Sequence, residues 1–309
     1  KHRSKYINTI KALDKGEITI GFLGGSITEG TDKWPEYVVA WIMEKFPGVR
    51  INFENAAIGA TGSALAVFRA EKEIIEKNCD LVFIEYAVND NYILKEQRAR
   101  SREGLMRKIL KNGKTDIVLA YTFFQPMYDD MLKGIIPESI TDFEVLADYY
   151  DVGSVWMGLY ALLENQKGWM RWEEWLPDGL HPGNRGSYSY AQSVISFLEF
   201  ELIKNIREPE ADNINEKKIP GPLNAMNWES TYIIPFKNIK IQGPWTIRRC
   251  ESTRWIDKML YTCAPGSKLS FSFRGRGIVF GFDFGKASAD FRYKIDSGDW
   301  TDVAMQRFD

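Results

Sequence analysis

The sequence predicts an α/β protein in which a three-layer α/β/α domain is followed by a smaller all-β sandwich domain. Up to about residue 206, apolar β-type runs alternate with segments of helical periodicity, and these runs are apolar at nearly every position. Such strands are typical of a parallel sheet that is covered on both faces. A polar stretch follows, and beyond residue 220 the helical period gives way to alternation with a period of two. The predicted division is a first domain over residues 1–206, a linker over residues 207–220 and a β domain over residues 221–309.

The elements of the first domain follow from these two periods in chain order. Apolar residues at helical spacing (Tyr6, Ile10 and Leu13) predict a helix within residues 1–16. The β-rich run 17–23 then ends in a pair of glycines, which predicts a strand that leads into a loop. The same criteria predict helices over residues 34–45, 63–77, 95–110 and 187–206, and strands over residues 50–56, 80–86, 116–121 and 152–155.

The β domain is predicted from alternating apolar residues that are separated by turn residues. Glu, Asp, Asn, Lys and Pro dominate the preceding linker, where apolar residues nearly vanish. The alternation suits a β-sandwich. The alternating sets are Leu269/Phe271/Phe273, Ile278/Phe280/Phe282/Phe284 and Phe291/Tyr293/Ile295, with turns at Pro265-Gly266, Gly275 and Ser297-Gly298.

Composition excludes several classes of function. The chain has 309 residues, of which 44% are hydrophobic and 27% charged, as in ordinary globular proteins. With 40 Lys+Arg against 42 Asp+Glu the formal charge is −2, so no nucleic-acid partner is expected. The apolar runs are short and carry charges, which argues against integral membrane association. Three cysteines without a C-x-x-C pair indicate neither a disulfide scaffold nor a zinc site.

Histidine is scarce, and one of the two is placed for acid–base chemistry. His2 lies near the start of the chain, so His181 is the residue available if the protein needs an imidazole. It belongs to Asp178-Gly-Leu-His181-Pro182, just before the last predicted helix. The carboxylate of Asp178 can hold one ring nitrogen and leave the other free to accept a proton from a serine. The alternative is a structural histidine near a helix start.

Ser26 is the serine that fits this role. It lies in Gly24-Gly25-Ser26-Ile-Thr-Glu-Gly30, where the first strand ends, and open α/β sheets bind ligands at that edge. A phosphate-binding loop is a weaker interpretation, because neither the G-x-G-x-x-G spacing nor the P-loop lysine is present. A third interpretation is that Ser26 merely caps the next helix.

Two further loops reach the same edge and can supply hydrogen-bond donors to an oxyanion. Gly59 lies in the loop after the second strand, and Asn89 lies in Tyr86-Ala-Val-Asn89-Asp90 after the third. Gly59 can bring a backbone N–H close, and Asn89 can offer its side-chain amide. Each loop alone is also compatible with a simple turn.

Together these four blocks resemble the SGNH hydrolases, also called GDSL esterases, in which Ser, Gly, Asn and His blocks occur in this order. The resemblance covers about residues 17–206 and assigns the nucleophile to Ser26, the oxyanion hole to Ser26, Gly59 and Asn89, and the D-x-x-H block to Asp178 and His181. It implies a flavodoxin-like α/β/α sandwich and ester hydrolysis through an acyl-enzyme without a metal or organic cofactor. Two of the four blocks differ from the family motifs. Gly25 and Ile27 replace the Asp and Leu that flank the serine in the G-D-S-L motif, and Ala87 replaces the first Gly of the G-x-N-D motif.

The expected substrate is an acylated carbohydrate. The residues of the four blocks are similar to those of a bacterial branch of this family that is found beside carbohydrate-degrading modules. Residues 266–282 resemble jelly-roll modules attached to carbohydrate esterases. Trp169, Trp172 and Trp175 precede Asp178 at a spacing of three, which suits either a sugar-stacking platform or a buried stripe.

We therefore expect a serine esterase that removes small acyl groups, above all acetyl, from a carbohydrate, and a β domain that can bind carbohydrate. One alternative is a lipase or thioesterase that uses the apolar loop 123–140, and another is an inactive glycan-binding protein. The chain begins at Lys1 rather than Met, which is compatible with a removed leader, so an extracellular or cell-surface location is favoured over the cytoplasm. The sequence does not predict an oligomeric state.

Overall fold

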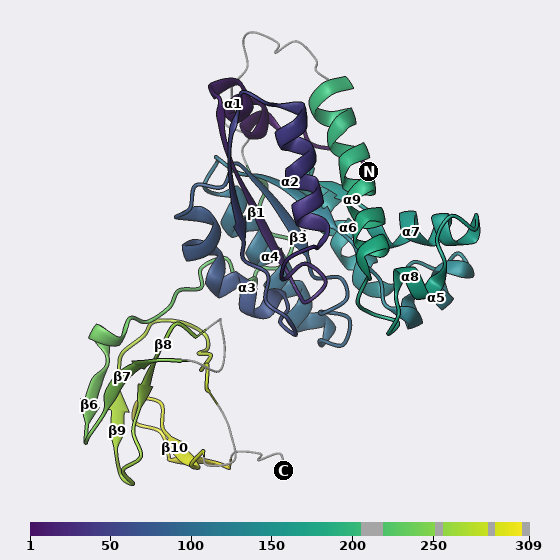
Figure 1. The fold of residues 1–309 in the computed structure, drawn as a ribbon. Helices are drawn as coiled ribbons and strands as arrows, with labels where there is room; N and C mark the ends of the chain where they lie inside the picture. The colour runs from purple at the N-terminus through teal and green to yellow at the C-terminus, as the bar shows by residue number, and fades with distance from the viewer. Residues whose placement is uncertain (205–218, 251–255, 284–287, 305–309) are drawn as a thin grey trace. The chain divides into compact units, whose positions relative to one another are not determined.

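A computed structural model describes residues 1–204, 219–250, 256–283 and 288–304 (Figure 1). The chain forms two compact units, Lys1–Tyr232 and Ile233–Asp309. Within the described residues, the first unit contains a mixed α/β structure around a parallel sheet, and the second contains small antiparallel sheets. The predicted fold class is confirmed.

The five strands of the first unit form one parallel sheet in the order β2-β1-β3-β4-β5. This order is that of the flavodoxin-like doubly wound folds, in which ligands bind at the carboxyl ends of the strands. The strands are β1 (Glu17–Gly24), β2 (Arg50–Asn55), β3 (Leu81–Glu85), β4 (Asp116–Ala120) and β5 (Gly153–Val155).

The helices lie in two layers, since α2 packs beside α9 while α3 packs beside α4 (Figure 1). Four of them, α5 to α8, are absent from the sequence-based prediction. The helices are α1 (Ile7–Lys15), α2 (Trp34–Lys45), α3 (Ser63–Ala70), α4 (Lys95–Leu110), α5 (Gln125–Leu132), α6 (Glu138–Tyr150), α7 (Met157–Gln166), α8 (Trp172–Trp175) and α9 (Asn184–Glu199), with π-helical turns η1 (Glu71–Ile75) after α3 and η2 (Phe200–Lys204) after α9.

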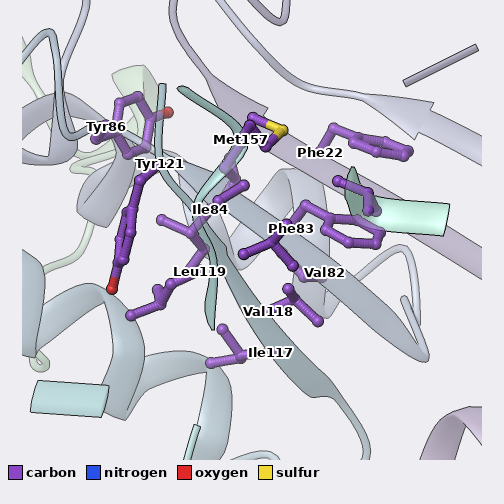
Figure 2. Packing of buried hydrophobic residues seen from close by; sticks show 14 of the residues in the cluster. Phe22, Val82, Phe83, Ile84, Tyr86, Ile117, Val118, Leu119, Tyr121 and Met157 are labelled. Carbon is purple, nitrogen blue, oxygen red and sulfur yellow. The ribbon is translucent and has the colours of Figure 1, made fainter. Parts of the chain in front are cut away.

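The core runs along the middle strands of the sheet, as Figure 2 shows. Every residue of β3 is buried, and the ring of Phe83 stacks on that of Phe22 in β1, with 5.0 Å between the centroids. Tyr86 and Tyr121, which follow β3 and β4, are also fully buried. This packing fixes the carboxyl ends of the strands, where the predicted site residues lie.

Residues 219–232 belong to the first unit, so the β unit begins later than the sequence predicts. The carboxylate of Glu103 in α4 accepts hydrogen bonds from the backbone N–H groups of Leu223 and Asn224. A Cβ on Gly104 would lie 2.6 Å from the Trp228 backbone, so this contact requires glycine. The segment has no helical periodicity, and for that reason the sequence pattern groups it with the β half. Most of the predicted linker, residues 207–218, lies outside the described residues.

The second unit confirms the all-β prediction in three antiparallel strand pairs among its described residues. None of those residues is buried. The described part of the predicted strand 278–284 has no strand pairing, although Phe280 and Phe282 contact other rings of the alternating sets. The paired strands are β6 (Lys240–Gln242) with β9 (Lys268–Ser270), β7 (Thr246–Arg249) with β8 (Lys258–Tyr261), and β10 (Phe291–Tyr293) with β11 (Thr301–Val303); a short 3-10 helix, η3 (Phe236–Asn238), precedes β6.

Candidate active site

Ser26 lies in a tight turn, residues 25–28, directly after β1. The N–H groups of Thr28 and Glu29 both donate to the Gly25 carbonyl. A Cβ on Gly25 would lie 2.2 Å from Oδ1 of Asn89, so only glycine lets the Asn89 side chain approach the turn this closely. The next helix, α2, begins after Lys33 and has no side-chain cap. Ser26 therefore does not cap that helix.

Ser26, His181 and Asp178 form a continuous hydrogen-bonded chain. Oγ of Ser26 lies 2.7 Å from Nε2 of His181, and Nδ1 of the same ring lies 2.7 Å from Oδ2 of Asp178. With its proton on Nδ1, the imidazole donates to the carboxylate and its Nε2 accepts from the serine hydroxyl. This is the arrangement in which a serine becomes a nucleophile.

The turn that holds Asp178 and His181 is fixed by its own backbone. Oδ1 of Asp178 accepts hydrogen bonds from the N–H groups of Leu180 (2.9 Å) and His181 (2.7 Å). The hydrogen bond from the His181 side chain, followed by the one from its backbone, lowers the pKa of Asp178 to about 2. Asp178 therefore stays ionised at neutral pH and can stabilise an imidazolium.

The predicted oxyanion donors lie on either side of the Ser26 turn, but one of them has a partner that the sequence does not reveal. Asn89 lies against Gly25, and a Cβ on Gly59 would lie 3.4 Å from the Cβ of Ser26. The N–H of Gly59 donates to Oε2 of Glu29 at 2.7 Å. A carboxylate and an oxyanion would repel each other at one donor, so Gly59 can hold an oxyanion only after the Glu29 side chain has turned away.

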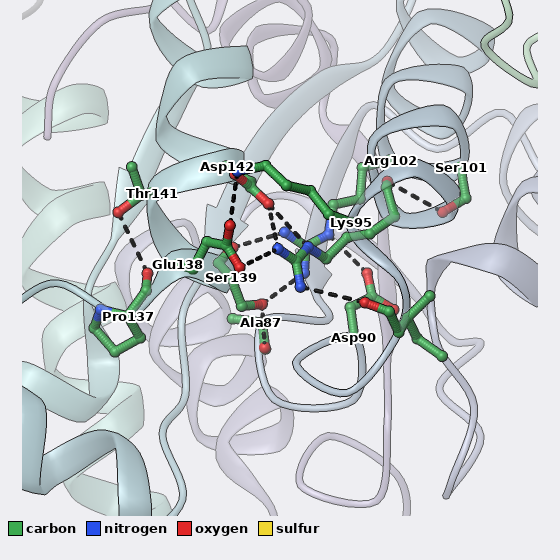
Figure 3. Close-up of polar contacts among 12 residues, drawn as sticks. Ala87, Asp90, Lys95, Ser101, Arg102, Pro137, Glu138, Ser139, Thr141 and Asp142 are labelled. Carbon is green, nitrogen blue, oxygen red and sulfur yellow. Dashed lines mark hydrogen bonds and ion pairs between the residues drawn. The ribbon is translucent and has the colours of Figure 1, made fainter.

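A buried ion pair supports the Asn89 loop, as Figure 3 shows. Oδ2 of Asp90 accepts from Nε of Arg102 in α4 at 2.7 Å, and its Oδ1 accepts from the Ser63 N–H at the start of α3. Arg102 also donates to the backbone and side-chain oxygens of Ser139, whose hydroxyl binds the Ala87 carbonyl. The loop is thus tied to three helices on the same side of the sheet, which holds Asn89 next to the Ser26 turn.

The three tryptophans do not form one exposed platform. Trp175 is fully buried and donates its indole N–H to the Tyr190 hydroxyl at 3.2 Å. It is therefore part of the core, and the expectation that it stacks on a sugar is wrong. Trp172 packs edge-on against Trp175 and Tyr128. Trp169 is 66% exposed and stays available as a surface residue.

A different aromatic pair, of which one ring is exposed, lies on the loops that carry the site. Tyr92, three residues after Asn89, is 79% exposed, and its ring lies 5.6 Å from that of Phe124. The residue after Phe124 donates its backbone N–H to the Gly179 carbonyl in the Asp178–His181 turn. The pair thus joins the Asn89 loop to the histidine turn, and sequence periodicity gave no signal for it.

Solved structures with the same fold have been reported as esterases. No protein-family profile and no curated protein matches the sequence. A two-domain esterase active on acetylated mannans, co-crystallised with mannopentaose, is 26% identical with a TM-score of 0.67, and the match covers 82% of this chain and 67% of that one. The present chain therefore spans about two thirds of the length of that esterase.

Two more distant structures share the fold over part of this chain. A catalytic mutant of an acetylxylan esterase from Geobacillus stearothermophilus has a TM-score of 0.52 at 17% identity, and covers 61% of this chain and 97% of its own. A GDSL-like lipase from Parabacteroides merdae has a TM-score of 0.51 at 16% identity, with coverages of 58% and 94%. At these identities the likeness concerns the fold alone.

The described parts of the chain lack two other features. There, no helix has the length and apolar character needed to cross a membrane. Among the same residues, no group of three or more His, Cys, Asp and Glu side chains is arranged to hold a metal ion.

Proposed function

We propose that this protein, whose first unit has the SGNH/GDSL fold of carbohydrate esterases, releases small acyl groups, in particular acetyl, from an acylated carbohydrate. The protein has the fold of the serine carboxylic ester hydrolases. The observation that carries the proposal is the chain of 2.7 Å contacts from Ser26 through His181 to Asp178, with Asn89 beside the same turn. An inactive glycan-binding protein is disfavoured because every proposed reacting residue is present.

The reaction follows from the positions of these groups. The Ser26 hydroxyl gives its proton to Nε2 of His181 as its oxygen attacks the ester carbonyl. Asp178 stabilises the resulting imidazolium, while the Asn89 amide and the Ser26 N–H donate to the oxyanion. His181 then protonates the leaving sugar hydroxyl, and an acyl-enzyme remains on Ser26. Water that gives its proton to His181 attacks this ester and releases the acid, which restores the free serine.

The similar structures, more than loop 123–140, support a short acyl group over the long chain of a lipase. In loop 123–140, Phe123, Met127, Tyr128 and Ile140 are buried in the core, whereas Leu132, Ile135 and Ile136 are exposed. The four buried side chains cannot line a groove for an acyl chain, so the lipase alternative depends on the three exposed ones. The similar structures include esterases active on acetylated mannans and an acetylxylan esterase, which supports acetyl as the acyl group.

The first test compares acyl chain lengths on one leaving group. The values of kcat/KM for p-nitrophenyl acetate, butyrate and octanoate should fall as the chain lengthens, because a small acyl site binds the extra methylenes poorly. Acetate release from acetylated manno- and xylo-oligosaccharides should be detectable under the same conditions. A preference for octanoate would support the lipase alternative, and the absence of acetate release would exclude the sugar substrates tried.

A second prediction concerns Tyr92 and Phe124 as the surface that receives the sugar. An exposed tyrosine ring beside a catalytic turn can stack on a sugar ring, and loss of one such contact weakens binding about three- to tenfold. Tyr92→Ala should therefore raise KM for an acetylated oligosaccharide by about that factor and leave p-nitrophenyl acetate hydrolysis unchanged.

The control for this prediction is Tyr160→Ala, which removes a partly exposed tyrosine from α7, outside both loops. This variant should change neither KM for the oligosaccharide nor the hydrolysis of p-nitrophenyl acetate. Trp169→Ala provides the competing test, because Trp169 is the exposed member of the original tryptophan set. If KM for the oligosaccharide rises in Trp169→Ala and not in Tyr92→Ala, Trp169 and not Tyr92 contacts the sugar.

A further inference from the structure

A carboxylate lies buried directly behind the Ser26 turn. Glu85 is the last residue of β3 and has no exposed surface. Oε2 accepts a hydrogen bond from the Thr28 hydroxyl at 2.9 Å, and Oε1 accepts one from the Thr122 hydroxyl at 2.6 Å. The backbone N–H of Gly25 also donates to this carboxylate. Two of the three donors therefore flank Ser26 on either side, at positions 25 and 28.

The hydroxyl of Thr28 is held in the orientation that this arrangement needs. The indole N–H of Trp34, itself fully buried at the start of α2, donates to Oγ1 of Thr28 at 3.0 Å. With one lone pair engaged in this way, the Thr28 proton points at Glu85. Glu85 forms no ion pair with any of the described residues. Its charge is therefore compensated by hydrogen bonds.

We propose that Glu85 is a positioning residue for the esterase reaction, and that its carboxylate must be ionised to hold the Ser26 turn in its productive conformation. The inference rests on the proposed function, since it assumes that Ser26 is the nucleophile. All three groups that contact the carboxylate are donors, so a carboxylate satisfies them with its lone pairs. A protonated carboxyl would bring a fourth hydrogen to the same place. It could keep the arrangement only if a threonine hydroxyl reoriented.

Glu85 ionises in a pH range in which the esterase can be assayed. Burial is the main cause that raises the pKa of Glu85 to about 7, against hydrogen bonds from Thr122, Thr28 and Gly25 that lower it. The charged and titratable groups that face it are Asp90, which follows in the Asn89 loop and raises its pKa, the neighbouring Tyr86, and Tyr190 from α9. Ionisation of Glu85 therefore accompanies the rise of pH through neutrality.

The decisive variant is Glu85→Gln, which keeps the shape and replaces one acceptor oxygen with a donor. Because a hydrogen bond to a buried ionised group is lost, kcat for p-nitrophenyl acetate should fall about 10- to 100-fold at pH 8, with little change in KM. Wild-type kcat/KM should fall toward acid pH as Glu85 takes up its proton. In the variant this part of the pH dependence should be lost, so the acid limb should become less steep.

Thr122→Val provides a second variant that keeps Glu85 itself. Removal of the Thr122 hydroxyl takes away a hydrogen bond that favours the ionised form, so the pKa of Glu85 should rise and the acid limb should move to higher pH. Thr115→Val is the matched control, since Thr115 is a buried threonine whose hydroxyl binds the Cys79 carbonyl at the amino end of the sheet. It should leave the pH profile unchanged.

The outcomes separate this inference from the proposed function. If Ser26→Ala hydrolyses the ester as fast as the wild type, the proposed function fails and this inference fails with it. If the activity depends on Ser26 while Glu85→Gln retains the wild-type kcat and pH profile, only the role of Glu85 is overturned. Should Glu85→Gln not fold, as thermal melting would show, Thr122→Val decides: an unshifted acid limb would refute the role of Glu85.

Discussion

Ser26→Ala and His181→Ala should each lower kcat for p-nitrophenyl acetate by about 10⁴- to 10⁶-fold while the protein stays folded. The first variant removes the attacking oxygen, and the second removes the base that lies 2.7 Å from it. Both side chains are partly exposed, so neither substitution opens a cavity in the core. Steady-state rates, with thermal melting to verify folding, provide the measurement.

Two controls make this result specific. Ser193→Ala removes a buried hydroxyl that binds the Tyr190 carbonyl, and His2→Ala removes the other histidine, which contacts Glu201. Both should retain activity. Asp178→Asn should lower kcat less than Ser26→Ala or His181→Ala, because the His181 base stays in place and loses only its orienting charge. Full activity in Ser26→Ala would eliminate the serine mechanism.

Asn89→Ala should lower kcat by about 10²- to 10³-fold and change KM little. The side chain lies against Gly25 beside Ser26, where its amide can donate to the oxyanion that exists only after attack. A donor used only in the transition state affects kcat rather than ground-state binding. Kinetics on p-nitrophenyl acetate measure both constants, and acetylated oligosaccharides extend the comparison to the proposed substrate.

Asn52→Ala is the corresponding control, because the Asn52 amide lies on β2 and binds Glu17 at the amino end of β1. It should leave both constants unchanged. If Asn89→Ala instead raised KM at constant kcat, Asn89 would be a substrate-binding residue. Melting curves should stay close to the wild type, since Asp90 makes the buried hydrogen bonds that tie this loop to α3 and α4.

The residues of the candidate site could be proposed from the sequence because their types and their positions in the chain both indicate the same edge of the sheet. Ser26, Gly59 and Asn89 each follow a strand of a parallel sheet, and such strands end at one edge. His181 could be singled out because the chain has one other histidine. The Asp178 partner lies three residues away, within reach by local geometry alone. These predictions needed no knowledge of how side chains pack.

The partners of these residues could not be predicted, because they come from distant parts of the chain. The contact of Glu29 with the Gly59 N–H spans 30 residues, and that of Glu85 with Thr122 spans 37. Neither leaves a periodic signal. The tryptophan stripe failed for a related reason: a spacing of three places side chains on one helix face but does not say whether that face points to solvent.

The missed helices α5 and α6 show the same limit. Loop 123–140 is apolar enough to suggest a groove for an acyl chain, yet Met127 and Ile140 fill the core. The segment 219–232 was misplaced because its contacts with α4 are largely made by backbone groups, as in the bonds from Leu223 and Asn224 to Glu103. Backbone hydrogen bonding is independent of side-chain type, so the residue pattern does not reveal it.

The buried carboxylate behind the Ser26 turn also couples folding to the uptake of a proton. The pKa of Glu85 is about 7 in the folded chain, against a value of 4.5 for an ordinary glutamate. Between these two pH values the folded state holds a proton that the unfolded state has released, so this group's contribution to the free energy of unfolding falls as pH rises. That contribution is complete below about pH 4.5 and is lost as pH rises through about 7. The ionised carboxylate that we assign to catalysis and the protonated one that favours folding thus prevail at opposite ends of this pH window.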